Sequence, residues 1–273
     1  MLSSRKNEKL QRISSPRTTL NLYRTITYDK QWNGKRLTVK SHLISKLNDE
    51  LDNVPYDLEI IELSPDNETS LTYVLKQVPV NILKFTSLRI LILDTNNLTS
   101  VPSDIGQLLC LQVLILSNNL LETLPNEFNA LNRLNSLHLS NNLFKQVPIC
   151  IYSMCELKFL DLTKNFITFL QDDIGTLKQL RYLSLHQNQL KTLPMTIGNL
   201  TYLETLWLGE NNLSQLPKTI INLTHLDWWH TSSSTKFFLE HSLDGNPLIR
   251  PPLSTIHNGY RATLEYFENE YTN

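Results

Sequence analysis

The chain of 273 residues has almost no net charge and no long apolar run, and both shortages exclude classes of protein. Lys and Arg number 25 against 26 Asp and Glu, so the sequence lacks the basic footprint of a nucleic-acid-binding domain. No apolar run approaches the ~18 residues that a membrane-spanning helix needs. The basic, serine-rich N-terminus also lacks the apolar core of a secretory signal.

Cysteine and catalytic signatures are scarce as well. Cys110, Cys150 and Cys155 form an odd set without the spacing of a disulfide framework or of paired zinc ligands. The sequence contains no Walker loop, no G-x-S-x-G or kinase signature and no H-E-x-x-H motif. We therefore expect a soluble, reduced, cytoplasmic protein without enzyme activity, metal or cofactor.

Leucine, by contrast, is abundant and recurs at fixed positions. Six consecutive copies of a 23-residue unit run from Leu88 to His225, each reading L-x-x-L-x-L-x-x-N-x-(L/F/I)-x-x-(L/V)-P-x-x-I-x-x-L-x-x with a few substitutions. Proline follows the asparagine in all copies but the fourth, which has Gln171. The asparagine of each copy, and the one that follows the last copy, are Asn96, Asn119, Asn142, Asn165, Asn188, Asn211 and Asn246. This period and signature are typical of a leucine-rich repeat solenoid.

The repeat predicts the shape of each coil. The segment x-x-L-x-L-x-x predicts a short strand that stacks in parallel on its neighbours, and the L-P-x-x-I-x-x-L half predicts a short helical or irregular return. An asparagine amide both donates and accepts, so we expect each one to bond the backbone of its own turn and of the neighbouring turn. The predicted fold class is α/β, a curved solenoid with parallel strands on the concave face and helical caps at both ends.

Both ends of the array predict caps. Residues 1–38 are interpreted as a flexible basic tail, and residues 39–57 as a capping segment whose stripe of Leu43, Leu47, Leu51 and Val54 predicts an amphipathic helix. A further degenerate repeat is the alternative for this segment. The repeats occupy residues 58–252, and residues 253–273 predict a C-terminal capping helix.

Residues 231–242 interrupt the last repeat. Deleting them brings Leu243 and Asn246 back into register, with Trp229 at a leucine position. The insertion is either a docking loop at the concave mouth, a phosphorylatable run, or a segment that the solenoid extrudes without a function, because long surface insertions cost little entropy.

The array resembles the plain intracellular leucine-rich repeat class typified by the Ras-pathway scaffold and the plant Ras-group proteins. Its ending, Leu243-Asp-Gly-Asn-Pro-Leu248 followed by Pro251-Pro252 and Gly259, is similar to the G-N-P-L…P-P…G ending of that class. The resemblance covers roughly residues 58–273 and implies protein–protein scaffolding in signalling or cytoskeletal complexes, without catalysis. The chain departs from the class in its short length and its two insertions, so partners do not carry over.

The outward strand positions predict the binding surface. An aliphatic zone comprises Ile90, Ile92, Val113 and Ile115, and an aromatic zone comprises Phe159, Tyr182, Trp207 and Trp228, with His138, Asp161, Lys164, His186 and Glu210 between and beside them. Exposed apolar faces mark interaction sites, and Trp and Tyr are frequent hot spots, so the aromatic zone is the predicted contact. The alternative is that the chain covers the zones itself, the aliphatic one with residues 68–74. His138 and Asp161, on adjacent strands, are expected to form a surface ion pair.

The predicted function is a non-enzymatic scaffold or adaptor in intracellular signal transduction. It acts as a monomer and holds a folded protein partner on its concave face, with a small GTPase or a phosphatase subunit as the expected kind of partner. The alternatives are a structural component of the cytoskeleton, for example of the axoneme, and, less favoured, the substrate-recognition subunit of a larger enzyme complex. Neither nucleic acid nor a membrane is an expected partner.

Overall fold

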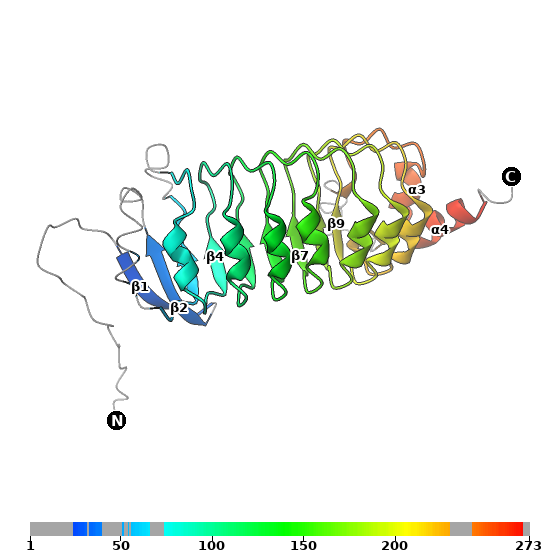
Figure 1. Cartoon of the computed structure of the whole chain (residues 1–273). Helices are drawn as coiled ribbons and strands as arrows, with labels where there is room; N and C mark the ends of the chain where they lie inside the picture. The colour runs from blue at the N-terminus through cyan, green and yellow to red at the C-terminus, as the bar shows by residue number, and fades with distance from the viewer. Residues whose placement is uncertain are drawn as a thin grey trace, which may run out of the picture.

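The computed structural model describes residues 24–31, 33–39, 51, 54, 56–65, 74–229 and 242–269. Figure 1 shows a row of similar coils stacked side by side, with two long strands at one end and two helices at the other. Each coil contributes one strand to a common sheet and one short helix to the opposite side. A coil of this kind cannot bury its own leucines, so stability comes from the stacking of neighbours.

The described strands form one nine-stranded sheet in chain order, β1 to β9. Strands β1 (Arg24–Asp29) and β2 (Gly34–Val39) pair antiparallel, and every later pair is parallel. The remaining strands are β3 (Ile60–Glu62), β4 (Ile90–Ile92), β5 (Val113–Ile115), β6 (Ser136–His138), β7 (Phe159–Asp161), β8 (Tyr182–Ser184) and β9 (Thr205–Trp207). The strands of the six regular copies lie where the repeat predicts them.

The side opposite the sheet consists of short 3-10 helices, which confirms the predicted helical return. They are η2 (Val80–Lys84), η3 (Ser103–Gln107), η4 (Asn126–Ala130), η5 (Ile149–Ser153), η6 (Asp172–Thr176), η7 (Met195–Asn199) and η8 (Lys218–Asn222). A proline with φ between −57° and −69° precedes each helix except η6. Gln171 takes that place before η6 with φ −75°, so the turn does not require the proline ring.

The asparagine ladder, which we define as the seven residues named above from Asn96 to Asn246, joins each coil to the one before it. In Asn142, Oδ1 accepts the backbone N–H of Leu121 at 3.0 Å. Its Nδ2 group donates to the carbonyls of Leu116 in the preceding coil, at 3.0 Å, and of Leu139 in its own coil, at 3.1 Å. Equivalent contacts recur at the other six ladder residues. The two-sided bonding expected of these amides is therefore confirmed.

Glycine sets the distance between neighbouring helices at three places. A methyl group at Gly198 of η7 would lie 2.4 Å from the carbonyl oxygen of Thr219 in η8, and one at Gly106 would lie 2.3 Å from that of Glu127. Gly175 has the same relation to Thr196, at 2.8 Å. These distances are far below van der Waals contact, so the close approach of η3 to η4, η6 to η7 and η7 to η8 depends on the missing side chain.

The N-terminal end differs from the prediction of a flexible tail over residues 1–38. Within that range, β1 and β2 form a hairpin whose turn contains Asn33, with φ +52°, followed by Gly34. Asparagine adopts positive φ more readily than most residues, so Asn33 before the strand is a weak turn signal in the sequence. Arg36 of β2 forms ion pairs with Asp29 of β1 and with Glu62 of β3, the latter at 2.6 Å, and these pairs tie the hairpin to the repeats.

The predicted capping helix lies mostly outside the described residues. Of its stripe, Leu51 and Val54 are described, and both are buried in the main core. Between Leu63 and Val78, residues 66–73 fall outside as well. The first strand within the predicted repeat region of residues 58–252 is β3, and the side chains of Leu58, Ile61 and Leu63 in and beside it lie in the core.

The last coil departs from the predicted strand. Asp227–Trp229 forms a 3-10 helix, η9, and residues 230–241 lie outside the described part of the chain. The register resumes as predicted, because the carbonyl of Ser242 accepts the N–H of Leu208 at 2.7 Å and Asn246 rejoins the ladder. The predicted single C-terminal helix is two helices, α3 (Leu253–His257) and α4 (Tyr260–Asn269), because Gly259 between them adopts φ +89°. Ile256 of α3 and Phe267 of α4 belong to the main core.

The ladder predicts a large effect of removing one buried amide. Asn142→Ala leaves the N–H of Leu121 and the carbonyls of Leu116 and Leu139 without this partner, so we expect the free energy of unfolding to fall by ~2–4 kcal/mol, since each orphaned group costs roughly 1–3 kcal/mol. Chemical denaturation measures the loss. Asn132→Ala, at an exposed site away from the ladder, is the matched control and should change stability by less than ~0.5 kcal/mol. Equal effects of the two substitutions would contradict the structural role of the ladder.

The glycine contacts predict a second, independent effect. Gly198→Ala forces η7 and η8 apart, so we expect a loss of ~1–3 kcal/mol, as for overpacked cores. Asn129 occupies the corresponding position of the second copy and is exposed, so Asn129→Ala should be close to neutral in the same thermal or chemical unfolding experiment. If Gly198→Ala is as well tolerated as Asn129→Ala, the close packing of these helices is not what the structure indicates.

Candidate protein-binding surface

The predicted surface residues that belong to strands lie on the face of the sheet opposite the core, which we call the sheet face. Strand pairing aligns them in two columns. The first column is Ile60, Ile90, Val113, Ser136, Phe159, Tyr182 and Thr205, and the second is Glu62, Ile92, Ile115, His138, Asp161, Ser184 and Trp207. The residue between the two columns in each strand points into the core. The repeat period therefore predicted which residues of β4 to β9 share this face, whereas Trp228, beyond β9, does not lie on it.

The aliphatic zone is less exposed than predicted. Ile60, Ile90 and Val113 retain only 1%, 2% and 6% of their exposure and form a cluster of their own, separate from the main core. Ile92 and Ile115 pack against this cluster and remain half-buried. Branched side chains on strands ~4.8 Å apart cover one another, which explains why residues that point away from the core are still buried. Ile90 and Val113 therefore offer little surface to a partner.

The aromatic zone forms a continuous row of rings, which we call the aromatic row: His138, Phe159, Tyr182 and Trp207. The His138 and Phe159 ring centroids are 4.5 Å apart, and the Phe159 and Tyr182 rings stack at 4.2 Å with only 4° between their planes. Trp207 meets Tyr182 edge-on at 5.4 Å and 70°. All four side chains are half-buried, so the row is held in place by its own stacking while part of it faces solvent.

Trp228 does not belong to this row, contrary to the prediction. It is only 1% exposed, lies in the main core, and donates its indole N–H to the carbonyl of Leu206 at 2.9 Å. Trp229, predicted at a leucine position, is instead half-buried and packs edge-on against Trp228 and Tyr260. Trp228 therefore takes the buried position predicted for Trp229. The cause is η9, because successive side chains of a 3-10 helix do not alternate between two faces as those of a strand do.

The predicted ion pair between His138 and Asp161 is not formed. His138 bonds to the hydroxyl group of Ser136 at 2.9 Å, and Asp161 accepts the backbone N–H of Thr163 at 3.0 Å. Burial lowers the pKa of His138, although the charges of Asp161 and Asp94 act in the opposite direction. The imidazole is therefore neutral near pH 7 and acts as a member of the aromatic row.

Asp161 is the charged group at the centre of this surface. Burial raises the pKa of Tyr182 well above its usual range, and the charge of Asp161 adds to that rise. Farther along, His186 lies 3.8 Å from a carboxylate oxygen of Glu210, which is largely exposed. The sheet face thus carries a half-buried aromatic row with carboxylates beside and beyond it.

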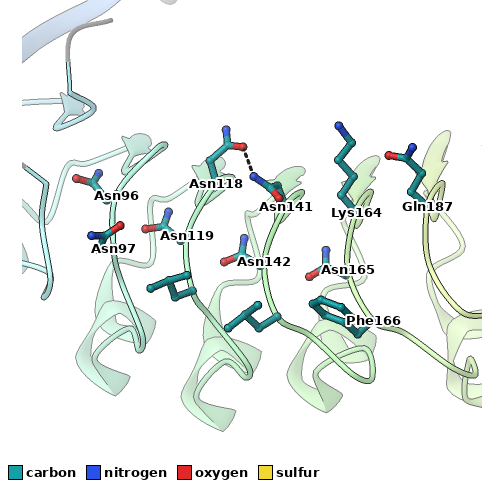
Figure 2. Close-up of a pocket in the computed structure, with 12 residues that line it drawn as sticks. Asn96, Asn97, Asn118, Asn119, Asn141, Asn142, Lys164, Asn165, Phe166 and Gln187 are labelled. Carbon is teal, nitrogen blue, oxygen red and sulfur yellow. Dashed lines mark hydrogen bonds between the residues drawn. The ribbon is translucent and has the colours of Figure 1, made fainter. Parts of the chain in front are cut away.

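A polar groove, which we call the amide groove, adjoins the sheet face along the ladder and was not predicted. Its volume is about 490 Å³, and its lining spans five coils: Asn96, Asn97, Asn118, Asn119, Leu120, Asn141, Asn142, Leu143, Lys164, Asn165, Phe166 and Gln187. Figure 2 shows the ladder side chains below a row formed by Asn118, Asn141, Lys164 and Gln187. These four residues precede ladder asparagines and have φ of +53° to +55°, which turns their side chains outward. The sequence feature that could have indicated this groove is the variable residue that directly precedes each ladder asparagine.

Two further findings concern metal sites and membrane-spanning helices among the described residues. Within the part of the chain that the structure describes, no group of three or more His, Cys, Asp or Glu side chains could hold a metal ion. None of the helices described there has the length and apolar character to cross a bilayer.

Comparisons with known proteins place the repeats in a family. One family model, a leucine-rich repeat region, matches residues 168–243, and another, a leucine rich repeat, matches residues 86–144. A solved leucine-rich repeat protein of Leptospira interrogans is 34% identical, with a TM-score of 0.61 over 70% of this chain and 46% of that one. No curated protein matches the chain.

Two receptors share the fold at lower identity. The leucine-rich repeat ectodomain of the membrane receptor kinase GASSHO1/SCHENGEN3 from Arabidopsis thaliana, solved with CASPARIAN STRIP INTEGRITY FACTOR 2, is 22% identical, with a TM-score of 0.57 over 74% of this chain and 24% of that one. A TDR receptor is 23% identical, with a TM-score of 0.59 over 71% of this chain and 31% of that one. The chain spans less than half of the length of each of these three structures. The stacked coils, the asparagine ladder and the two family matches together make this chain a leucine-rich repeat protein.

Proposed function

We propose that this chain is a non-enzymatic scaffold or adaptor of intracellular, cytoplasmic signalling, which holds a folded protein partner on its sheet face. Proteins of the leucine-rich repeat family generally mediate protein–protein interaction. The resemblance of the array and its ending to the Ras-scaffold class favours a signalling partner, with a small GTPase or a phosphatase subunit as the first candidates. A protein partner that covers the sheet face would bury ~1,200–2,000 Å², the size of a standard interface.

The observation that carries this proposal is the aromatic row. Phe159, Tyr182 and Trp207 lie on three consecutive strands, are half-buried, and are fixed by stacking before any partner arrives. Aromatic side chains in this position contribute large contact area at a small entropic cost, because little freedom remains to be lost on binding. Trp and Tyr are also among the residues most often found to dominate interface energies.

Rigid, partly apolar surfaces bind well when polar groups fix the orientation of the partner. Asp161, His186 and Glu210 supply such groups beside the row, and the amide groove extends the polar border along the ladder. In the other half of the sheet face, the first-column residues Ile60, Ile90 and Val113 are buried, and only Ile92 and Ile115 of the aliphatic zone remain half-buried. We therefore assign the contact to the half of the sheet face from β6 to β9.

Replacing the tryptophan at the β9 end of the row tests the proposal. We expect Trp207→Ala to reduce the recovery of bound proteins at least tenfold when the full chain is used as bait in lysate of its native cell, because a central aromatic hot spot contributes about 2 kcal/mol or more. Quantitative mass spectrometry of the captured proteins measures the change.

Tyr202→Ala is the matched control for this substitution. Tyr202 is 55% exposed and lies outside the sheet strands, in the turn before β9, so its removal should leave the captured proteins unchanged. Circular dichroism and the midpoint of thermal unfolding establish that both variants are folded. If folded Trp207→Ala captures the same proteins as the unaltered chain, the sheet face is not the binding surface, and the chain acts as a rigid structural component instead.

A further inference from the structure

We propose that the partner meets the sheet face with a basic segment, whose arginine or lysine side chains contact the carboxylates beside the aromatic row. This inference rests on the proposed function and adds the chemistry of the partner. It follows from the charges that remain on this face once the internal ion pairs are accounted for.

Arg89 and Arg181, two basic side chains along one edge of the sheet, are neutralised within the molecule. Arg89 lies 3.0 Å from a carboxylate oxygen of Glu59, and Arg181 lies 2.7 Å from one of Glu204. Both arginines lie at the start of their strands, in the row that precedes the first column of the sheet face. Lys158, which precedes Phe159 in the same row, is exposed and leaves one positive charge at that edge.

The carboxylates at the other edge accept hydrogen bonds from side-chain amides or the backbone instead. Asp94 accepts the side-chain amide of Asn118 at 3.0 Å, and Glu210 accepts that of Gln187 at 2.7 Å. Asp161 accepts a backbone N–H, and no ion pair joins it to any residue that the structure describes. Hydrogen bonds from amides orient a carboxylate without cancelling its charge, so these groups are prepared to receive a cation.

The balance of charge at this edge is negative. Asp94, Asp161, Glu210 and Asp244 lie on the sheet face or on its turns, and Lys164 is the one basic residue among the corresponding positions of the described coils. The negative potential reaches the aromatic row, since the charge of Asp161 acts to raise the pKa of both Tyr182 and His138. A positively charged partner is therefore favoured electrostatically over an acidic one.

The aromatic row fits the rest of such a segment. The side chains of arginine and lysine have apolar stems that lie along apolar surface while the charged head reaches a polar group. Phe159, in the same strand as Asp161, and Tyr182, in the next strand, provide that surface in the first column, and Trp207 continues it toward Glu210. An arginine or lysine that lies over the row can thus place its stem on the rings and its charge on Asp161.

The test uses two labelled peptides of equal length that are identical except that one carries arginine where the other carries glutamate. Fluorescence anisotropy measures the binding of each to the full chain at low and at physiological ionic strength. We expect the arginine peptide to bind more tightly than the glutamate peptide, and its affinity to fall as salt rises, because salt screens exposed charges. Trp207→Ala should also weaken the binding of the arginine peptide to the chain.

Charge-removing variants locate the site. The double variant Asp161→Asn, Glu210→Gln should lower the affinity for the arginine peptide about tenfold, as expected for close charges across an interface. Glu122→Gln, Asp172→Asn changes the net charge equally at two exposed residues outside the sheet face, and should change the affinity less than about twofold. Thermal unfolding confirms that both double variants are folded.

Three results would overturn the inference: no binding of the arginine peptide, equal or tighter binding of the glutamate peptide, or equal weakening by the two double variants. The proposed function is judged separately. If lysate proteins are lost with Trp207→Ala but retained with Asp161→Asn, Glu210→Gln, the sheet face binds a partner that is not basic at this contact.

Discussion

The structure depends on the stacking of coils that cannot bury their leucines alone, and the asparagine ladder fixes the distance and register of that stacking. Each ladder amide satisfies an N–H and a carbonyl of the preceding coil as well as a carbonyl of its own turn. Without these bonds, the tight turn after every strand would bury unpaired backbone groups. Because the turn is satisfied, the short strands keep parallel register and the variable residues of successive coils come into line.

That alignment turns a sequence repeat into a surface. Side chains that are 23 residues apart in the chain become neighbours on adjacent strands, as Phe159 and Tyr182 do in a near-parallel stack. Each short strand places only two side chains on the sheet face. The residues at these two variable positions therefore determine the chemistry of the face. The aromatic row and the carboxylates beside it are such positions, whereas the leucines beneath them are the same in each coil.

The regular coils could be predicted from the sequence because their residues carry both a period and a reason for it. Leucine at alternate strand positions, asparagine at the turn and proline before the return each act locally, and the structure places them as expected. The ends could not be predicted as well, since a terminal coil has no neighbour to impose the pattern. Trp228 illustrates this: its position in the repeat points outward, yet η9 buries it and its indole N–H bonds to the carbonyl of Leu206, in the last described strand of the sheet.

Exposure within the candidate surface was the second feature that the repeat alone did not determine. Ile90 and Phe159 occupy the same position of their copies, but Ile90 is covered by branched neighbours whereas Phe159 keeps part of its ring accessible. Which outward side chains cover one another depends on the volumes of those on the two adjacent strands, and on packing in three dimensions. The hairpin of β1 and β2 was missed for another reason, because it lies in a segment whose composition resembles that of a tail.

The most direct test of the account is hydroxyl-radical footprinting of the full chain with a captured partner. We expect the partner to reduce the reactivity of Phe159, Tyr182 and Trp207 several-fold, while Tyr202 and Phe169, which are exposed outside the sheet strands, stay as reactive as in the free chain. Protection of Tyr202 or Phe169 with an unchanged aromatic row would contradict the assignment of the sheet face as the binding surface.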